Sequence, residues 1–94
     1  MATIDIQRAH SLSMEHVREA AEELVETLEK DFGLEHNWEN ENLVKFSCRP
    51  KGINGTLKVQ PDKLHLNVKL GLLASMFERP LRKEIEEYLN THLG

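Results

Sequence analysis

The chain has 94 residues, of which 39% are hydrophobic and 30% charged, a composition typical of a globular domain and not of a disordered segment. Asp and Glu (16) outnumber Lys and Arg (12), and the resulting net charge of −4 gives no support to nucleic-acid binding, which requires a basic stripe. We therefore expect one domain over residues 1–94, of modest stability because a chain this short buries only roughly 60–65% of its unfolded surface.

The single cysteine, Cys48, rules out an internal disulfide and a Cys-rich metal site. The sequence shows no basic start followed by an apolar core, and no apolar run approaches the length of a membrane span. We therefore expect a cytoplasmic protein with neither a signal peptide nor a transmembrane segment.

Residues 3–7 alternate β-branched apolar and polar side chains, which predicts a short strand. Ser13 is a favourable N-cap, Glu15 follows in the first turn, and Gly33 stands where a left-handed C-cap belongs. Between these caps the sequence predicts a helix over about residues 14–31. Its apolar stripe consists of Met14, Val17, Ala21, Leu24, Val25, Leu28 and Phe32.

Four further strands are predicted over residues 34–39, 43–48, 53–59 and 64–70, because each alternates apolar and polar side chains. Gly55 shares the inward face of its strand, where it leaves room for a neighbouring side chain or marks a bulge. His36 points inward and His65 outward. The short turns between these strands predict an antiparallel meander.

The last quarter of the chain carries apolar residues at spacings of three or four, which predicts an amphipathic helix. They are Leu73, Phe77, Leu81, Ile85, Tyr88 or Leu89, and His92. Pro80 lies inside this pattern, and it either kinks or breaks the helix or is the first residue of a second helix after a turn at residues 72–77. We favour the kink or break.

The predicted element order is therefore β-α-β-β-β-β-α, an α+β fold. One face of the antiparallel sheet is apolar and the other polar, so both helices are expected to pack on the same face. The charge is two-sided, because much of the acid lies in the helix over residues 14–31 while the strands and their turns carry Lys45, Arg49, Lys51, Lys58, Lys63 and Lys69.

Reactive side chains are present, but their pattern does not predict a catalytic or metal site. The five histidines are spread over separate elements without paired spacing, whereas zinc needs three or four convergent ligands. The paired carboxylates lie on predicted helix faces or a turn, where solvated charge is expected. Cys48 shares an inward face with Val44 and Phe46, which favours a buried, inert thiol. We expect no enzyme activity, no catalytic residue, no metal and no cofactor.

Two apolar features point to binding. Two helices on a curved sheet can enclose a cavity for an apolar ligand. Its predicted lining is Trp38, Phe46, Leu57, Leu66, Met76, Phe77 and Leu81, although the same residues are needed to fill the core. Alternatively, if Pro80 releases residues 72–77 from the helix, they present an exposed apolar patch to a partner, a granule or a lipid surface.

Several short motifs, taken together, resemble the polyhydroxyalkanoic acid system (granule-region) proteins, a small bacterial family. They are Thr3-Ile4-Asp5-Ile6 with the His10-Ser11-Leu12 approach to the first helix, Phe32-Gly33-Leu34 running into Trp38-Glu39, Gly52-Ile53-Asn54-Gly55, and Leu70-Gly71-Leu72-Leu73 before Pro80, Ile85 and Leu89. The likeness covers residues 3–93, and its motifs are structural positions. The turn Cys48-Arg49-Pro50-Lys51 is longer and more basic than the family pattern.

The resemblance implies a cytoplasmic protein associated with storage of polyhydroxyalkanoate, a hydrophobic polyester kept as granules, and it implies no catalytic residues. Our leading hypothesis is a non-enzymatic accessory protein that binds a granule surface or a granule-associated protein through apolar surface. The alternative is a small helix-grip-like domain that binds an acyl-type ligand between the sheet and the C-terminal helix. The small core and the polar outer face of the sheet leave room for a homodimer.

Overall fold

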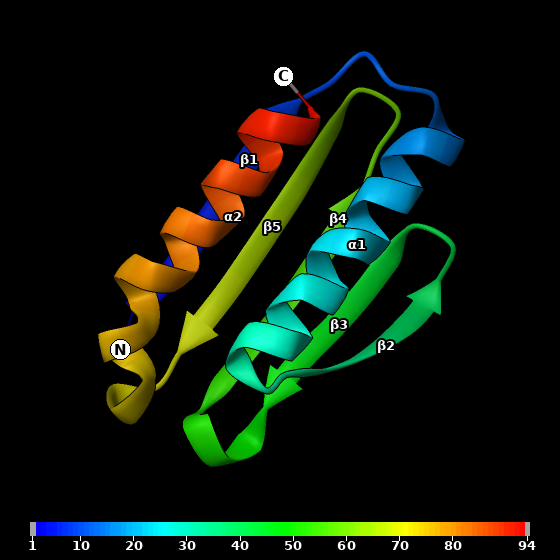
Figure 1. The fold of residues 1–94 in the computed structure, drawn as a ribbon. Coiled ribbons are helices and arrows are strands. Elements are labelled where there is room, and N and C mark those ends of the chain that lie inside the picture. Colours follow the sequence, from blue (N-terminus) through cyan, green and yellow to red (C-terminus); the bar gives the residue numbers. More distant parts are fainter. Residues whose placement is uncertain (1, 94) are drawn as a thin grey trace.

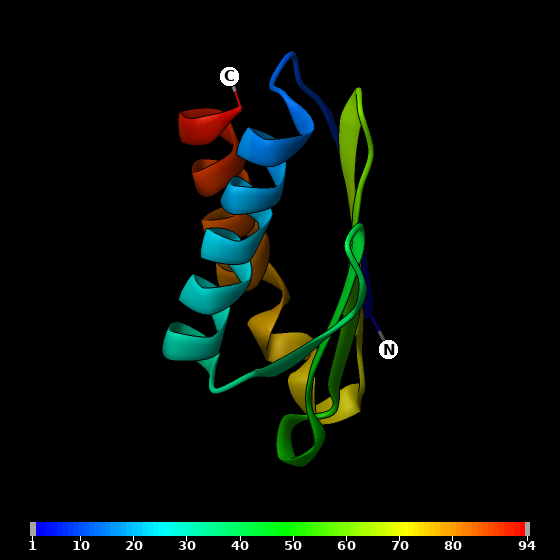
Figure 2. The same cartoon turned by 90° about the vertical axis from the view of Figure 1, so that its right-hand side faces the viewer.

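The computed structural model describes residues 2–93, which form two layers, a five-stranded sheet and a pair of helices on one of its faces (Figures 1 and 2). The elements in chain order are β1 (Ala2–Ala9), α1 (Met14–Phe32), β2 (Glu35–Asn40), β3 (Leu43–Cys48), the 3-10 helix η1 (Arg49–Lys51), β4 (Ile53–Val59), β5 (Lys63–Leu70), the 3-10 helix η2 (Leu72–Phe77) and α2 (Glu78–His92). The predicted α+β fold and its element order are confirmed.

The sheet is antiparallel throughout, in the order β1-β5-β4-β3-β2. Four strands form the predicted meander, and β1 adds to it by pairing with β5, its most distant strand in sequence. Because side chains alternate between the two faces of a strand, pairing in register aligns the apolar ones into rows. One such row crosses all five strands through Ile6, Leu66, Leu57, Val44 and Trp38.

Helix α1 begins and ends at the predicted caps. The Ser13 hydroxyl accepts a hydrogen bond from the His16 amide at 3.2 Å. At the other end Gly33 adopts a left-handed conformation, with φ of 70°, and its N–H donates to the Glu29 carbonyl at 2.8 Å. These contacts satisfy backbone groups that the helix itself leaves unpaired. The face of α1 toward the sheet is buried through Val17, Ala20, Ala21, Leu24, Val25, Leu28 and Phe32.

Gly55 provides space for an aromatic ring, one of the two roles expected for it. It lies opposite Phe46 in the β3–β4 pair. A Cβ atom added at Gly55 lies only 2.4 Å from the Phe46 ring, which is itself 2% exposed. The ring therefore occupies the space that a side chain at position 55 would need, and any such side chain overlaps it.

The last quarter of the chain is two elements rather than one continuous stripe. Pro80 is the third residue of α2, where it needs no intrahelical hydrogen bond for its nitrogen. In an α-helix continued toward the N-terminus, the Pro80 ring would clash with the carbonyl of Met76, four residues earlier. The helix therefore begins at Glu78, and the preceding residues form η2. Neither α1 nor α2 combines the length and apolarity that a membrane-crossing helix needs.

Helix α2 buries Leu81, Ile85 and Leu89 against the sheet and lies beside α1 (Figure 1). Polar contacts join the two helices along their shared side. The Tyr88 hydroxyl donates to the Glu23 carboxylate at 2.7 Å. Farther along, burial and then the neighbouring Asp31 carboxylate raise the pKa of Glu84 from its ordinary value of 4.5 to about 7.

Substituting Gly55 tests the packing of Phe46. Gly55→Ala is expected to lower the free energy of unfolding by about 1–3 kcal/mol, because the new methyl group overlaps the ring. Urea denaturation measures this change. Combining it with Phe46→Leu should recover part of the loss, whereas Asn54→Ala, at the exposed neighbouring position, should have little effect. Additive losses in the double variant would contradict the assignment.

Stability should also fall between pH 4.5 and about 7, because the folded protein holds a proton on Glu84 that the unfolded chain releases. The stability that the proton on Glu84 contributes is complete below pH 4.5, and it is lost as the pH rises through about 7. Glu84→Gln should therefore flatten this dependence and raise the melting temperature at pH 8. The control is Glu86→Gln on the same helix. Equal pH dependence in wild type and Glu84→Gln would show that Glu84 is not responsible.

Candidate functional site

The most exposed large apolar side chains among residues 2–93 lie together in η2. Leu72, Leu73 and Met76 are 80%, 82% and 75% exposed, respectively. We call these three residues the η2 patch. Large apolar residues left in water at adjacent positions are typical of a surface that contacts a partner or a lipid phase.

The other residues of η2 show why these three face outward. Ala74 is fully buried, and Phe77 packs its ring edge-on against Phe32, with centroids 6.4 Å apart. In a 3-10 helix, positions three residues apart lie on the same side. Ala74 and Phe77 therefore attach one side to the core, and Leu72, Leu73 and Met76 project from the remainder.

The turn formed by η1 holds η2 in place. The Lys51 ammonium donates to the Phe32 carbonyl at 2.8 Å and lies 5.4 Å from the centroid of the Phe77 ring. The Gly71 N–H donates to the Gly52 carbonyl at 2.9 Å. Both 3-10 helices consequently lie at the same end of the molecule (Figures 1 and 2). These contacts connect η2 to α1 and to the η1 turn, and they fix the position of the segment that carries the η2 patch.

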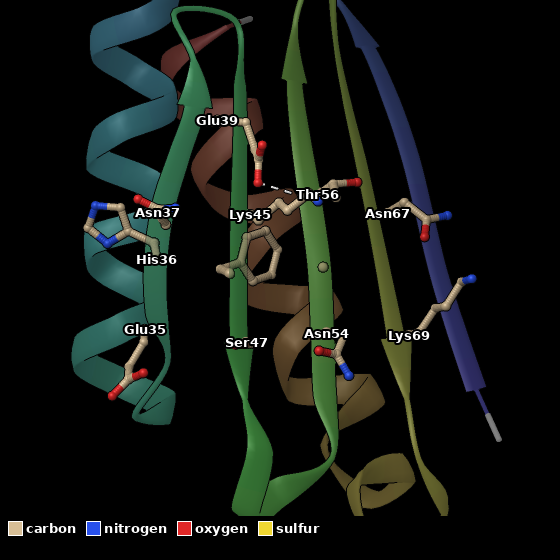
Figure 3. A pocket seen from close by; sticks show the side chains of 12 residues that line it. Glu35, His36, Asn37, Glu39, Lys45, Ser47, Asn54, Thr56, Asn67 and Lys69 are labelled. Atoms are coloured by element: carbon tan, nitrogen blue, oxygen red, sulfur yellow. Dashed lines mark ion pairs between the residues drawn. The ribbon is translucent and has the colours of Figure 1, made fainter.

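A second feature is an open pocket of about 610 Å³ on the outer face of the sheet, the face away from the helices (Figure 3). Most of its lining residues are of polar type, and they come from β2, β3, β4 and β5. The residues are Glu35, His36, Asn37, Glu39, Lys45, Phe46, Ser47, Asn54, Gly55, Thr56, Asn67 and Lys69.

Several charges at this pocket are already paired within the protein. Lys45 and Glu39 form an ion pair at 3.4 Å (Figure 3). Asn67 donates to the Asp5 carboxylate at 2.9 Å, and this hydrogen bond, with that of His65, holds the pKa of Asp5 below its usual value. The amides, hydroxyls and charges of this surface suit polar contacts.

The predicted cavity lining is divided among three environments. Phe46, Leu57, Leu66 and Leu81 are buried in one continuous core, and Trp38 and Phe77 pack partly buried against it. Met76, by contrast, is exposed and does not lie between sheet and helices, because the start of α2 at Glu78 leaves it outside the helix. Leu72 and Leu73 are not part of that predicted lining. They belong to residues 72–77, the segment for which the sequence alternatively predicts an exposed apolar patch. Their signal in the sequence is an apolar run ending just before Pro80.

The side chains considered for chemistry form isolated pairs. His36 pairs with the Glu29 carboxylate of α1, and His65 with Asp5 at 3.1 Å. Within residues 2–93, no group of three or more His, Cys, Asp or Glu side chains is placed to hold a metal ion. Cys48 is partly exposed instead of buried, because β3 ends there and the chain turns into η1. It borders a smaller pocket of about 450 Å³ that includes Gly33 and Arg49.

Comparison with known proteins identifies the family of the chain. The family model described as "Putative polyhydroxyalkanoic acid system protein" matches residues 4–93. No curated protein and no solved structure gives a significant match to the chain. The match spans nearly the whole sequence and includes β1, both helices and η2. The chain therefore belongs to the polyhydroxyalkanoic acid system protein family.

Proposed function

We propose that this protein is a non-enzymatic, cytoplasmic accessory protein of polyhydroxyalkanoate storage that binds the granule through the η2 patch. Membership of the family supports the link with this polyester. The exposure of Leu72, Leu73 and Met76 is the observation that carries the mode of binding. The η2 patch contacts the granule surface or a protein that is bound to it.

The physical basis is the removal of apolar surface from water at both partners. Each of the three side chains contributes about 2 kcal/mol when it becomes buried, or about 6 kcal/mol together. Loss of translational and rotational freedom costs at least about 4 kcal/mol in association. Binding through the patch alone is therefore weak and reversible, and removal of one side chain has a large effect.

The burial of Phe46, Leu57, Leu66 and Leu81 favours this function over the alternative of an acyl ligand held between sheet and C-terminal helix. All four belong to one core cluster and are at most 2% exposed. An acyl chain has to displace contacts that these residues make with one another. The η2 patch needs no such rearrangement, because it already faces water.

Co-sedimentation of the purified protein with polyhydroxyalkanoate particles tests the proposal. Leu73→Asp should weaken binding by more than about tenfold, because it removes an apolar contact and adds a charge that must be desolvated. Gln7→Asp adds the same charge on the exposed face of β1, far from η2, and should bind like wild type.

Circular dichroism and the melting temperature establish that both variants are folded. If wild type does not sediment with the particles, direct binding to the polyester fails. If Leu73→Asp sediments as well as wild type, the η2 patch is not the binding surface.

A further inference from the structure

The η2 patch lies at a basic end of an otherwise acidic protein. Arg49 of η1, Lys69 of β5, and Arg79 and Lys83 of α2 are all exposed. Within residues 2–93, none of these four side chains takes part in a salt bridge, since the five pairs that form involve other cations. Four exposed cations thus remain free to meet an external anion.

Two of these cations flank η2 in sequence, and a backbone hydrogen bond brings the turn that carries a third beside it. Lys69 lies three residues before Leu72, and Arg79 lies three residues after Met76. The hydrogen bond from Gly71 to the Gly52 carbonyl brings the η1 turn, which carries Arg49, beside the start of η2. Lys83 follows Arg79 by four residues, on the same side of α2.

The acidic side chains at this end are Asp31 at the end of α1, Glu35 at the start of β2, Glu78, which pairs with Arg82 at 3.9 Å, and Glu84, which lies beside Asp31. They are outnumbered by the basic side chains, which include Lys51 and Arg82 besides the four exposed cations. The exposed acidic residues Glu15, Glu19, Glu22 and Glu23 lie in the first half of α1, which begins at the opposite end of the molecule (Figure 1). An anionic surface therefore attracts the η2 end and repels the other, which orients the patch toward it.

Resting on the function proposed above, we propose that the surface met by the η2 patch is an anionic lipid layer. Leu72, Leu73 and Met76 insert among the acyl chains, and Arg49, Lys69 and Arg79 contact the phosphate groups of the lipid heads. The polyester itself carries ester groups but no net charge, so a bare polyester surface would leave these cations without counterions. A lipid layer supplies both the apolar phase and the negative charge.

The size and shape of the patch favour a lipid layer over a protein partner. A stable protein interface uses about 20–30 residues on each side. The η2 patch has three apolar side chains, projecting from a six-residue 3-10 helix at one end of the molecule. Insertion into a fluid layer requires no complementary surface, so a few projecting side chains supported by neighbouring cations are sufficient.

Each basic side chain near an anionic lipid surface increases affinity by about fivefold. Three of them together contribute roughly a hundredfold, and this part of the affinity weakens as salt rises because the charges become screened. The apolar part persists in salt. Binding to anionic lipid should therefore depend on both kinds of residue, and binding to bare polyester on the apolar residues alone.

Vesicle sedimentation with the full chain tests the inference. Wild type should bind mixed vesicles of phosphatidylcholine and phosphatidylglycerol more than about tenfold tighter than phosphatidylcholine alone, and added salt should reduce the difference. Arg49→Glu combined with Arg79→Glu should abolish this preference, whereas Leu73→Asp should weaken binding to both kinds of vesicle. Lys58→Glu combined with Lys63→Glu makes the same charge change on strands of the outer face and should preserve the preference.

Parallel sedimentation with bare polyhydroxyalkanoate particles separates the two proposals. Binding of wild type to the particles but not to anionic vesicles overturns the lipid inference and leaves the proposed function standing. Equal binding to neutral and anionic vesicles also overturns it, as does an Arg49→Glu, Arg79→Glu variant that keeps the wild-type preference. Loss of vesicle binding in that variant, with binding to bare particles retained, supports the inference.

Discussion

Burial of the single apolar face of the sheet is the interaction on which the rest of the structure depends. Because β1 pairs with β5, residues from the first and fifth strands in sequence contribute to the same inner rows. Both helices cover that face (Figure 2). Mostly polar residues line the pocket on the outer face. In a chain of 94 residues this single core has to provide most of the stability, so its apolar side chains pack against one another and are not available to bind a ligand. This packing explains why apolar residues available for binding are found outside the core.

The end of the sheet decides where those residues lie. After β5 the chain cannot enter an α-helix at once, because Pro80 excludes Met76 from the same helix. The intervening six residues form η2, which is attached by Ala74 and Phe77 and supported by Lys51. The basic turn at residues 48–51 therefore has a structural role in this protein. It joins α1, η2 and the sheet at one end.

The functional interpretation follows from the contrast between this end and the rest of the molecule. Elsewhere in residues 2–93 no large apolar side chain is as exposed, and most residues that line the outer pocket are polar or charged. At η2, apolar and cationic side chains are adjacent, which is the combination that an interfacial binding segment uses. Burial of the apolar side chains and attraction of the cations contribute free energies of comparable size, and each alone gives only weak binding. Reversible association of a small acidic protein with a granule is consistent with this balance.

The sequence by itself determined the element order, the caps of α1, and the strand limits to within one or two residues. These features depend on local periodicity and on residues with special backbone properties, and both are visible in the order of amino acids. For Gly55 the sequence left two roles open, room for a neighbouring side chain or a bulge. Tertiary structure decided the pairing of β1 with β5 and the partial exposure of Cys48. It also decided which apolar residues of the last quarter are buried. Leu73 and Leu81 follow the same periodic pattern, yet only Leu81 is covered, because coverage depends on where the sheet ends and on how Pro80 and the η1 turn direct the chain beyond it.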